Sequence, residues 1–222
     1  MIVVDLKMSA GVSRVFLLSP ANCNGRRGAQ LLSPKSQSVV AQRLNSSDGV
    51  SLGELFAFVS QLYFRGKLTY ARHFAAPPEI DNPIVGTGVH VITTNAGLRS
   101  PDTRVTRSAI RQFAAENIDP DNRAYRRPLE QSAKALRREI GDCEVVLLGS
   151  VASGKYVDLL LPIFGDRLMF PVHFVGRGDM SRGGLMLRCV RSGEELTYGP
   201  LGLATRHGPR PPKLPKLERR PG

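Results

Sequence analysis

Residues 149–155 have the spacing of a phosphate-binding loop, Gly-Ser-Val-Ala-Ser-Gly-Lys, and follow a short apolar run. In such a loop, backbone N–H groups and a helix N-terminus face an anion, and the lysine reaches over it. Tyr156 stands where a nucleotide triphosphatase has a Ser or Thr that holds magnesium. The pattern predicts either an anion or nucleotide-edge site without ATPase chemistry, or a purely structural turn. The candidate substrate-binding residues here are Gly149, Ser150, Ser153, Lys155 and Tyr156.

Cys23 is the candidate nucleophile. It lies in a polar loop after the first apolar run, between Asn22 and Asn24, and Arg26 and Arg27 follow it. In an open α/β sheet, the loops at the carboxyl ends of the strands line the ligand crevice. Neighbouring arginines would lower the pKa of the thiol and increase the thiolate fraction. The alternative is a small, half-buried thiol in a turn.

Two further polar segments carry candidate groups. Asn95 follows the second apolar run and could present its amide to a base edge, or simply form a turn. Arg177, Asp179 and Arg182 lie in a glycine-rich stretch, residues 176–184, that we expect to be a loop. They could clamp a substrate, with Asp179 accepting a hydrogen bond from a ring N–H or acting as a base. An internal salt bridge explains them equally well.

Basic residues are in excess, with 31 Lys and Arg against 19 Asp and Glu and a net charge of +12. This excess favours a polyanionic partner, nucleic acid above all. A solvated basic surface is the alternative, and Lys67, in a helical segment, could either border a phosphate path or belong to such a surface.

The composition also limits the class of protein. No apolar run approaches the roughly 18 residues of a membrane span, and the N-terminus has charges inside its short apolar segment. The three cysteines, Cys23, Cys143 and Cys189, are odd in number and lack metal-ligand spacing. We therefore expect a reduced, cytoplasmic protein without a metal or cofactor.

Apolar runs alternate with amphipathic segments, which predicts an α/β fold. The expected strands are 12–19, 89–93, a run from 143, and 168–175, and the expected helices are 37–44, 106–117, 126–140, 156–164 and one from Ser51 that Gly66 breaks or kinks. Segments 185–190 and 195–198 predict a C-terminal hairpin. Residues 1–204 are expected to form a single domain. The basic, Pro-rich residues 205–222 are expected to be a disordered or polyproline-like tail.

Four segments together resemble the YaaA-like domains of unknown function, which are related in fold to the uracil-DNA glycosylases. They are Leu-Leu-Ser-Pro-Ala-Asn-Cys-Asn, Leu-Tyr-Phe-Arg-Gly-Lys-Leu-Thr-Tyr-Ala-Arg, Val-Ile-Thr-Thr-Asn-Ala-Gly-Leu-Arg-Ser-Pro-Asp-Thr and Leu-Leu-Gly-Ser-Val-Ala-Ser-Gly-Lys-Tyr, within residues 13–165. The resemblance implies a three-layer α/β sandwich with a mostly parallel central sheet. It also implies one crevice, built by the loops around Cys23, Asn95 and residues 149–155.

The resemblance further implies chemistry on nucleobases, including modification of 7-deazaguanine-type bases in DNA. One such step hydrates a nitrile to an amide, and Cys23 could attack the nitrile carbon to form a thioimidate that water opens. No catalytic Asp or His of the uracil-DNA glycosylases matches a residue of this chain, so base excision is not supported.

Two functions compete on this evidence. The first is a nucleobase-acting enzyme of hydrolase type on nucleic acid or a nucleoside, with Cys23 as nucleophile and Asp179 as an orienting or basic group. In it, Asn22 and Asn95 would orient the base, while Ser153, Lys155 and Arg177 would hold phosphate. The second is a non-catalytic nucleic-acid-binding module that uses basic helix faces and the tail. A nucleotide sensor or a partner-binding protein that works through the tail is a third hypothesis.

Overall fold

A six-stranded sheet forms the middle of the protein, whose computed structural model describes residues 12–205 and 207–215. The strands lie in the order β4-β3-β1-β6-β7-β8. Their bounds are Arg14–Leu18 for β1, Val89–Ile92 for β3, Leu98–Arg99 for β4, Glu144–Leu148 for β6, Leu168–Pro171 for β7 and Tyr198–Pro200 for β8. The four inner strands are parallel, and the edge strands β4 and β8 are antiparallel to their neighbours. The predicted mostly parallel central sheet is confirmed.

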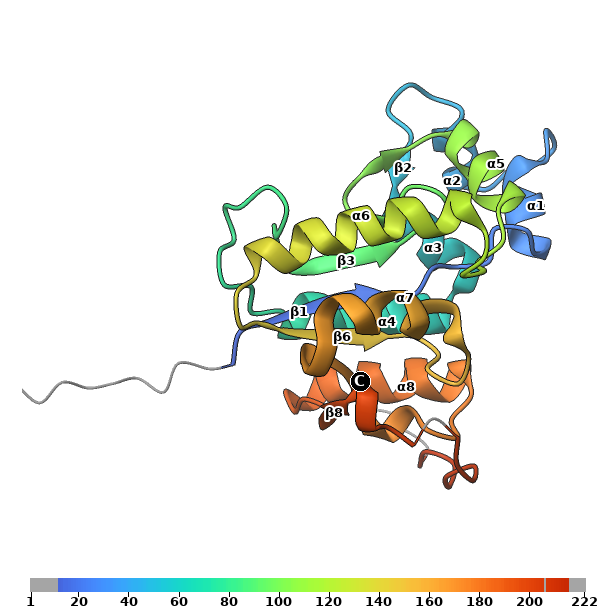
Figure 1. The fold of residues 1–222 in the computed structure, drawn as a ribbon. Coiled ribbons are helices and arrows are strands. Elements are labelled where there is room, and N and C mark those ends of the chain that lie inside the picture. Colours follow the sequence, from blue (N-terminus) through green and yellow to red (C-terminus); the bar gives the residue numbers. More distant parts are fainter. Residues whose placement is uncertain (1–11, 206, 216–222) are drawn as a thin grey trace, which may run out of the picture.

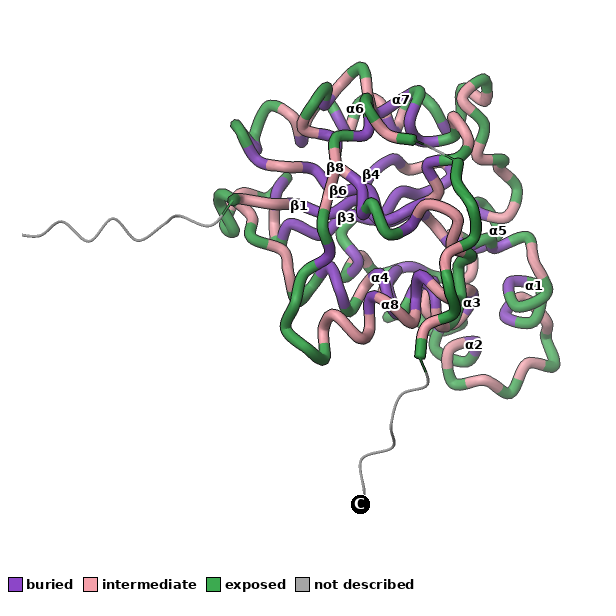
Figure 2. The backbone as a smooth tube through the Cα atoms, turned by 90° about the horizontal axis from the view of Figure 1, so that it is seen from below, coloured by how far each residue is buried: buried purple, intermediate pink, exposed green. Residues whose placement is uncertain are grey.

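Helices cover both faces of the sheet, so the predicted three-layer α/β sandwich is also confirmed (Figure 2). α6 (Arg123–Glu139) and α7 (Gly154–Phe164) lie on one face, and α3 (Leu52–Ser60), α4 (Leu62–Phe74) and α8 (Asp179–Ser192) lie on the other. The shorter helices α1 (Arg26–Leu32), α2 (Val39–Leu44) and α5 (Arg107–Ala115) gather at one end, near the small sheet of β2 (Val50–Ser51) and β5 (Arg104–Val105) (Figure 1). α1 begins within a stretch that the sequence predicted to be a loop.

The central strand β1 shows why the chain folds in three layers. Its side chains alternate between two apolar clusters, with Phe16 and Leu18 facing the α3, α4 and α8 side and Val15 and Leu17 facing α6 and α7. All four side chains are fully buried. A parallel strand with four consecutive buried apolar residues needs cover on both faces, and the amphipathic helices supply it.

Two glycines allow α4 and α8 to pack backbone against backbone. A Cβ atom at Gly66 would lie 2.7 Å from the carbonyl oxygen of Gly183, and one at Gly183 would lie 2.7 Å from the carbonyl oxygen of Leu62. Gly66 lies inside α4, so the prediction that it breaks the helix is wrong. The helical run is interrupted earlier, at Gln61, where φ is 49°.

The predicted C-terminal hairpin is also wrong. Residues 185–190 belong to α8, and β8 pairs with β7 instead. The glycine-rich start of α8 is helical because its small residues fit against α4, so tertiary packing overrides the low helix propensity of glycine. The predicted strand 168–175 ends as β7 at Pro171.

Residues 207–215 contain neither helix nor strand, as expected of a Pro-rich segment. They are not detached from the domain, however. An Nη1 atom of Arg177 donates a hydrogen bond to the carbonyl oxygen of Pro212 at 3.4 Å, and Arg188 donates one to the carbonyl oxygen of Pro215. The described part of the tail therefore contacts the segment around α8, and residues 206 and 216–222 lie outside the described residues.

Candidate functional site

A polar pocket of about 570 Å³ lies where the carboxyl ends of β1 and β3 meet the start of α7. Its wall consists of residues 20–24 after β1, Thr94 after β3, Phe113 of α5, residues 116–119 between α5 and α6, and Lys155 and Tyr156 of α7. The chain leaves β1 towards α3 and α4 on one face, and it leaves β3 towards α6 on the other. Ligands of open α/β sheets bind at such a switch in direction.

Five of the predicted site residues line this pocket: Asn22, Cys23, Asn24, Lys155 and Tyr156. Asn95 does not line it, although its neighbour Thr94 does, and neither do Gly149, Ser150 and Ser153. The prediction that the loop after β1 and the segment around Lys155 share one ligand crevice is consistent with this geometry. The loop after β3 contributes only Thr94.

The expectation that arginines activate Cys23 is wrong. Cys23 is only 3% exposed, and burial raises the pKa of its thiol to about 12. Arg26 and Arg27 belong to α1 and are exposed, and Arg27 donates to the carbonyl oxygen of Val59. The thiol is therefore protonated at neutral pH, which fits the alternative of a small packing residue.

The loop after β6 is built tightly. A Cβ atom at Gly149 would lie 3.0 Å from the Cβ atom of Ser19, and one at Gly154 would overlap the carboxylate of Asp158. That carboxylate places a negative charge beside the first turn of α7 and opposes phosphate binding there. Lys155 is exposed and is one of the residues that line the pocket.

Asp179 is the first residue of α8, Arg177 lies two residues before it, and neither lines the pocket. An oxygen of Asp179 lies 3.7 Å from an Nη1 atom of Arg182, and Arg177 donates to the hydroxyl of Ser181 at 3.2 Å. This geometry corresponds to the internal salt bridge, which was the alternative to a substrate clamp. The pair of Asp179 and Arg182 lies in a helix rather than in a loop.

A buried polar cluster that the sequence analysis missed lies behind the pocket wall. Lys67, on α4, is only 1% exposed, and its Nζ atom donates to the Ser19 carbonyl oxygen at 2.5 Å and to the Ser19 hydroxyl at 2.8 Å. Burial lowers the pKa of Lys67 to about 7, the nearby charge of Asp179 raises it, and that of Arg182 lowers it. The prediction that Lys67 lies on a solvated face or beside a phosphate path is wrong.

Two tyrosines complete this cluster. Burial raises the pKa of both Tyr63 and Tyr156. The Ser19 side chain lowers both pKa values, so the two tyrosine hydroxyls lie near the Ser19 hydroxyl. The Tyr63 hydroxyl is buried and has no hydrogen-bond partner within the described part of the chain. Helical spacing could have revealed the cluster, because Lys67 falls on the same inward face of α4 as Tyr63 and Tyr70.

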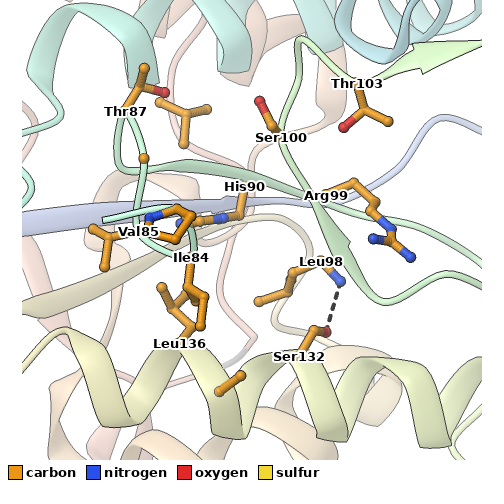
Figure 3. Close-up of a pocket in the computed structure, with 14 residues that line it drawn as sticks. Ile84, Val85, Thr87, His90, Leu98, Arg99, Ser100, Thr103, Ser132 and Leu136 are labelled. Carbon is orange, nitrogen blue, oxygen red and sulfur yellow. Dashed lines mark hydrogen bonds between the residues drawn. The ribbon is translucent and has the colours of Figure 1, made fainter. Parts of the chain in front are cut away.

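A second cavity, of about 520 Å³, lies away from these loops, between residues 83–87, β3, β4 and α6 (Figure 3). The backbone N–H of Leu98 donates to the hydroxyl of Ser132 at its floor, at 2.9 Å. His90 lines it, and burial lowers the pKa of its imidazole to about 4, so the ring is neutral at physiological pH. Arg99 is the charged residue among those that line this cavity.

Comparison with protein-family models, with curated proteins and with solved structures finds no match to this chain. Within residues 12–205 and 207–215, no group of three or more His, Cys, Asp and Glu side chains could hold a metal ion. In the same residues, no helix combines the length and the apolar character needed to cross a membrane. The candidate site is therefore interpreted from its own geometry.

Proposed function

We propose that the protein is an enzyme that acts on a nucleobase, bound in the pocket where β1, β3 and α7 meet. The observation that carries the proposal is the convergence of loops distant in the sequence on one polar pocket of about 570 Å³. This volume falls within the usual range of small-molecule sites, roughly 300–1,000 Å³, so the pocket is of a suitable size for a nucleoside.

The polar groups of this pocket suit a heteroaromatic ring with both donors and acceptors. Asn22, Asn24 and Asn117 supply amides, which can donate and accept, and Glu116 and Asp119 supply carboxylates, which accept. One oxygen of Glu116 accepts from Asn122 at 2.9 Å, which leaves the other carboxylate oxygen for a ring N–H. A bare phosphate would meet these two carboxylates at close range, so the pocket favours a base over a phosphate.

Basic side chains next to the pocket favour a base that is part of nucleic acid. α6 begins just after the pocket-lining residues 116–119, and its outer face is strongly basic. Its exposed basic residues are Arg123, Arg126, Arg127, Lys134 and Arg138. Within the described residues, only Arg126 among these forms an ion pair, with Glu130 at 2.7 Å. These charges and Lys155 could attract a phosphate backbone.

Nitrile hydration through Cys23 is not part of this proposal. That reaction needs a thiolate, and the pKa of Cys23 is raised to about 12 by burial. The resemblance to YaaA-like domains supports the nucleobase class of substrate, while the pocket geometry supports the place at which it binds.

Calorimetric titration with nucleosides and with a short single-stranded oligonucleotide tests the proposal. We expect Lys155→Ala to weaken oligonucleotide binding and Asn22→Ala to weaken nucleoside binding, each by about tenfold. Lys35→Ala changes one exposed lysine away from the pocket and serves as the matched control. Undetectable nucleoside binding by the wild-type protein at millimolar concentration would overturn the proposal.

The basic face of α6 also supports a second candidate, a non-catalytic nucleic-acid-binding module. The two differ in how binding responds to salt. A module that contacts only phosphates should lose oligonucleotide affinity steeply as salt rises and should not bind free nucleosides. A nucleobase enzyme should keep its nucleoside affinity, because those contacts are not ionic.

A further inference from the structure

We infer that Ser19 and Lys67 act together as a nucleophile and a general base. The bond that they hydrolyse is an amide or ester bond of an acyl group carried by the bound substrate. The inference rests on the proposed function for the identity of the substrate, a nucleobase, and on the buried cluster for the chemistry. In this pair Ser19 supplies the attacking oxygen and Lys67 accepts its proton.

The contact between the two side chains is direct. The Nζ atom of Lys67 lies 2.8 Å from the Oγ atom of Ser19, within the range in which a base takes a proton from a nucleophile. The second acceptor of the amine, at 2.5 Å, is the carbonyl oxygen of the same serine. Both contacts hold the amine at the carboxyl end of β1, where the chain turns into the pocket wall.

A purely structural role explains this lysine poorly. Its Nζ atom is in hydrogen-bond contact only with Ser19 within the described residues, and an apolar side chain could fill the same space without burying an amine. The nearest carboxylate, that of Asp179, is mostly exposed and lies closer to Arg182. Because burial and Arg182 both favour the neutral amine, Lys67 can act as a base near neutral pH.

The surroundings of the Ser19 hydroxyl supply what such a reaction also needs. The buried Tyr63 hydroxyl has no partner within the described residues and lies near Ser19, so it can donate to the oxyanion that forms on the acyl oxygen. Tyr156 lies beside Ser19 and also lines the pocket. Pro20, which follows Ser19 directly, lines it as well, so the pair lies immediately behind the pocket wall.

The proposed reaction transfers the acyl group of the substrate to Ser19 and then to water. The Oγ atom of Ser19 forms a bond to the acyl carbon while its proton moves to Lys67, and the carbonyl π electrons move to the acyl oxygen. The intermediate collapses, the bond to the leaving amine or alcohol breaks, and the proton on Lys67 moves to that group. Water then attacks the acyl-serine, Lys67 takes its proton and returns it to Ser19, and a carboxylic acid is released.

A fluorophosphonate probe tests the pair without knowledge of the substrate. The serine oxygen displaces fluoride from phosphorus, and mass spectrometry of peptides locates the added mass. We expect labelling at Ser19, none in Ser19→Ala, and a rate about 100-fold lower in Lys67→Met. Lys35→Ala, which removes an exposed lysine, should be labelled at the wild-type rate. A folded wild-type protein that is not labelled at Ser19, or equal rates with and without Lys67, would overturn the inference.

A measurement on the wild-type protein covers the case in which a variant does not fold. NMR titration of ¹³C-labelled lysines should show Lys67 losing its proton near neutral pH, and the rate of probe labelling should rise over the same range. The groups that face this amine are Asp179 and Arg182 of α8, Tyr63 of α4 and, through Ser19, Tyr156 of α7. A Lys67 that stays protonated up to about pH 9 would contradict the assignment.

The failure of this inference differs from the failure of the proposed function. Labelling at Ser19 without nucleoside binding would leave the pair in place and remove the nucleobase as substrate. Nucleoside binding without labelling at Ser19 would leave the pocket and remove the pair.

Discussion

The two faces of the sheet bury very different side chains. The face under α4 and α8 holds both buried charged residues among those described, Lys67 and Arg182. The face under α6 and α7 buries an apolar cluster together with the neutral imidazole of His90. The hydroxyl of Tyr125 there donates to the carbonyl oxygen of Lys155 at 2.9 Å. A face built for stability alone would look like the second. The first therefore indicates that burial of an amine serves the pocket rather than the fold.

The polar face depends on close contact between two helices. Arg182 and Lys67 are the sequence neighbours of Gly183 and Gly66, at which α8 and α4 touch. Arg182 donates to the carbonyl oxygen of Phe174 at 2.9 Å, which fixes the start of α8 over the cluster. The helix contact thus sets the distance between Arg182 and the amine.

Gly183→Ala should have the largest effect on stability. Its Cβ atom would lie 2.7 Å from the backbone oxygen of Leu62, so the helices must move apart. We expect a loss of about 3 kcal/mol in the free energy of unfolding, measured by urea denaturation. The adjacent Gly184→Ala is the matched control, since its Cβ atom would meet a leucine methyl at 3.6 Å. It should stabilise α8 by about 0.5–1 kcal/mol, and equal losses in both variants would contradict the glycine contact.

Cys23 should be the less reactive of the two compared thiols, as the packing alternative from the sequence implies. With the pKa raised to about 12 by burial, we expect iodoacetamide to modify Cys23 about 100-fold more slowly at pH 7.5 than a free thiol. Cys189 is less buried and provides the internal comparison, and unfolding in guanidinium should equalise the two rates. Fast modification of Cys23 in the folded protein would restore the thiolate hypothesis.

The positions of strands and of pocket loops were largely predictable from the sequence. Apolar runs such as that around Phe16 identify buried parallel strands, and parallel strands bring their carboxyl ends together. This is why the sequence predicts one crevice for Asn22 and Lys155, and both residues line the same pocket. The sequence leaves open whether Cys23 is reactive or buried, because its burial depends on the apolar cluster that α1 and other distant segments form around it.

The helix α8 and the burial of Lys67 could not be predicted from the sequence, for a related reason. The run of glycines around residue 183 has low helix propensity, and only contact with α4 makes it helical. The residue type favours a surface position for Lys67, because lysine is rarely buried, even though its helical spacing from Tyr63 places it on the inward face. In both cases the residues behave unlike most residues of their type, and in both cases they lie at the buried polar cluster.

The pH dependence of stability should differ between wild type and Lys67→Met. The folded-state pKa of Lys67 is lowered from 10.5 to about 7, so between these values the unfolded chain holds a proton that the native state has lost. Stability therefore rises with pH above about 7, with a slope of up to about 1.4 kcal/mol per pH unit. The useful window ends near pH 8.5, where the raised pKa of Cys23 begins to act in the opposite direction.

Urea denaturation of both proteins between pH 7 and about 8.5 measures this slope. The lowered pKa of His90, about 4, affects stability only below the window. Lys67→Met should show a flat profile, because it lacks the titrating amine. Parallel profiles in the two proteins would mean that the buried amine keeps its proton.

Tyr125→Phe on the apolar face should have the smallest effect. The change removes one hydroxyl that donates to the carbonyl oxygen of Lys155 at 2.9 Å and leaves the ring in place. We expect a loss of about 1 kcal/mol in the free energy of unfolding, equal at pH 7 and pH 8.5 because no charge of Lys67 is involved. Fluorophosphonate labelling of Ser19 should be unchanged, since this hydroxyl contacts α7 from the other side of the sheet. A change in labelling as large as that in Lys67→Met would show that the two faces are coupled, and the contrast between them would then no longer explain the site.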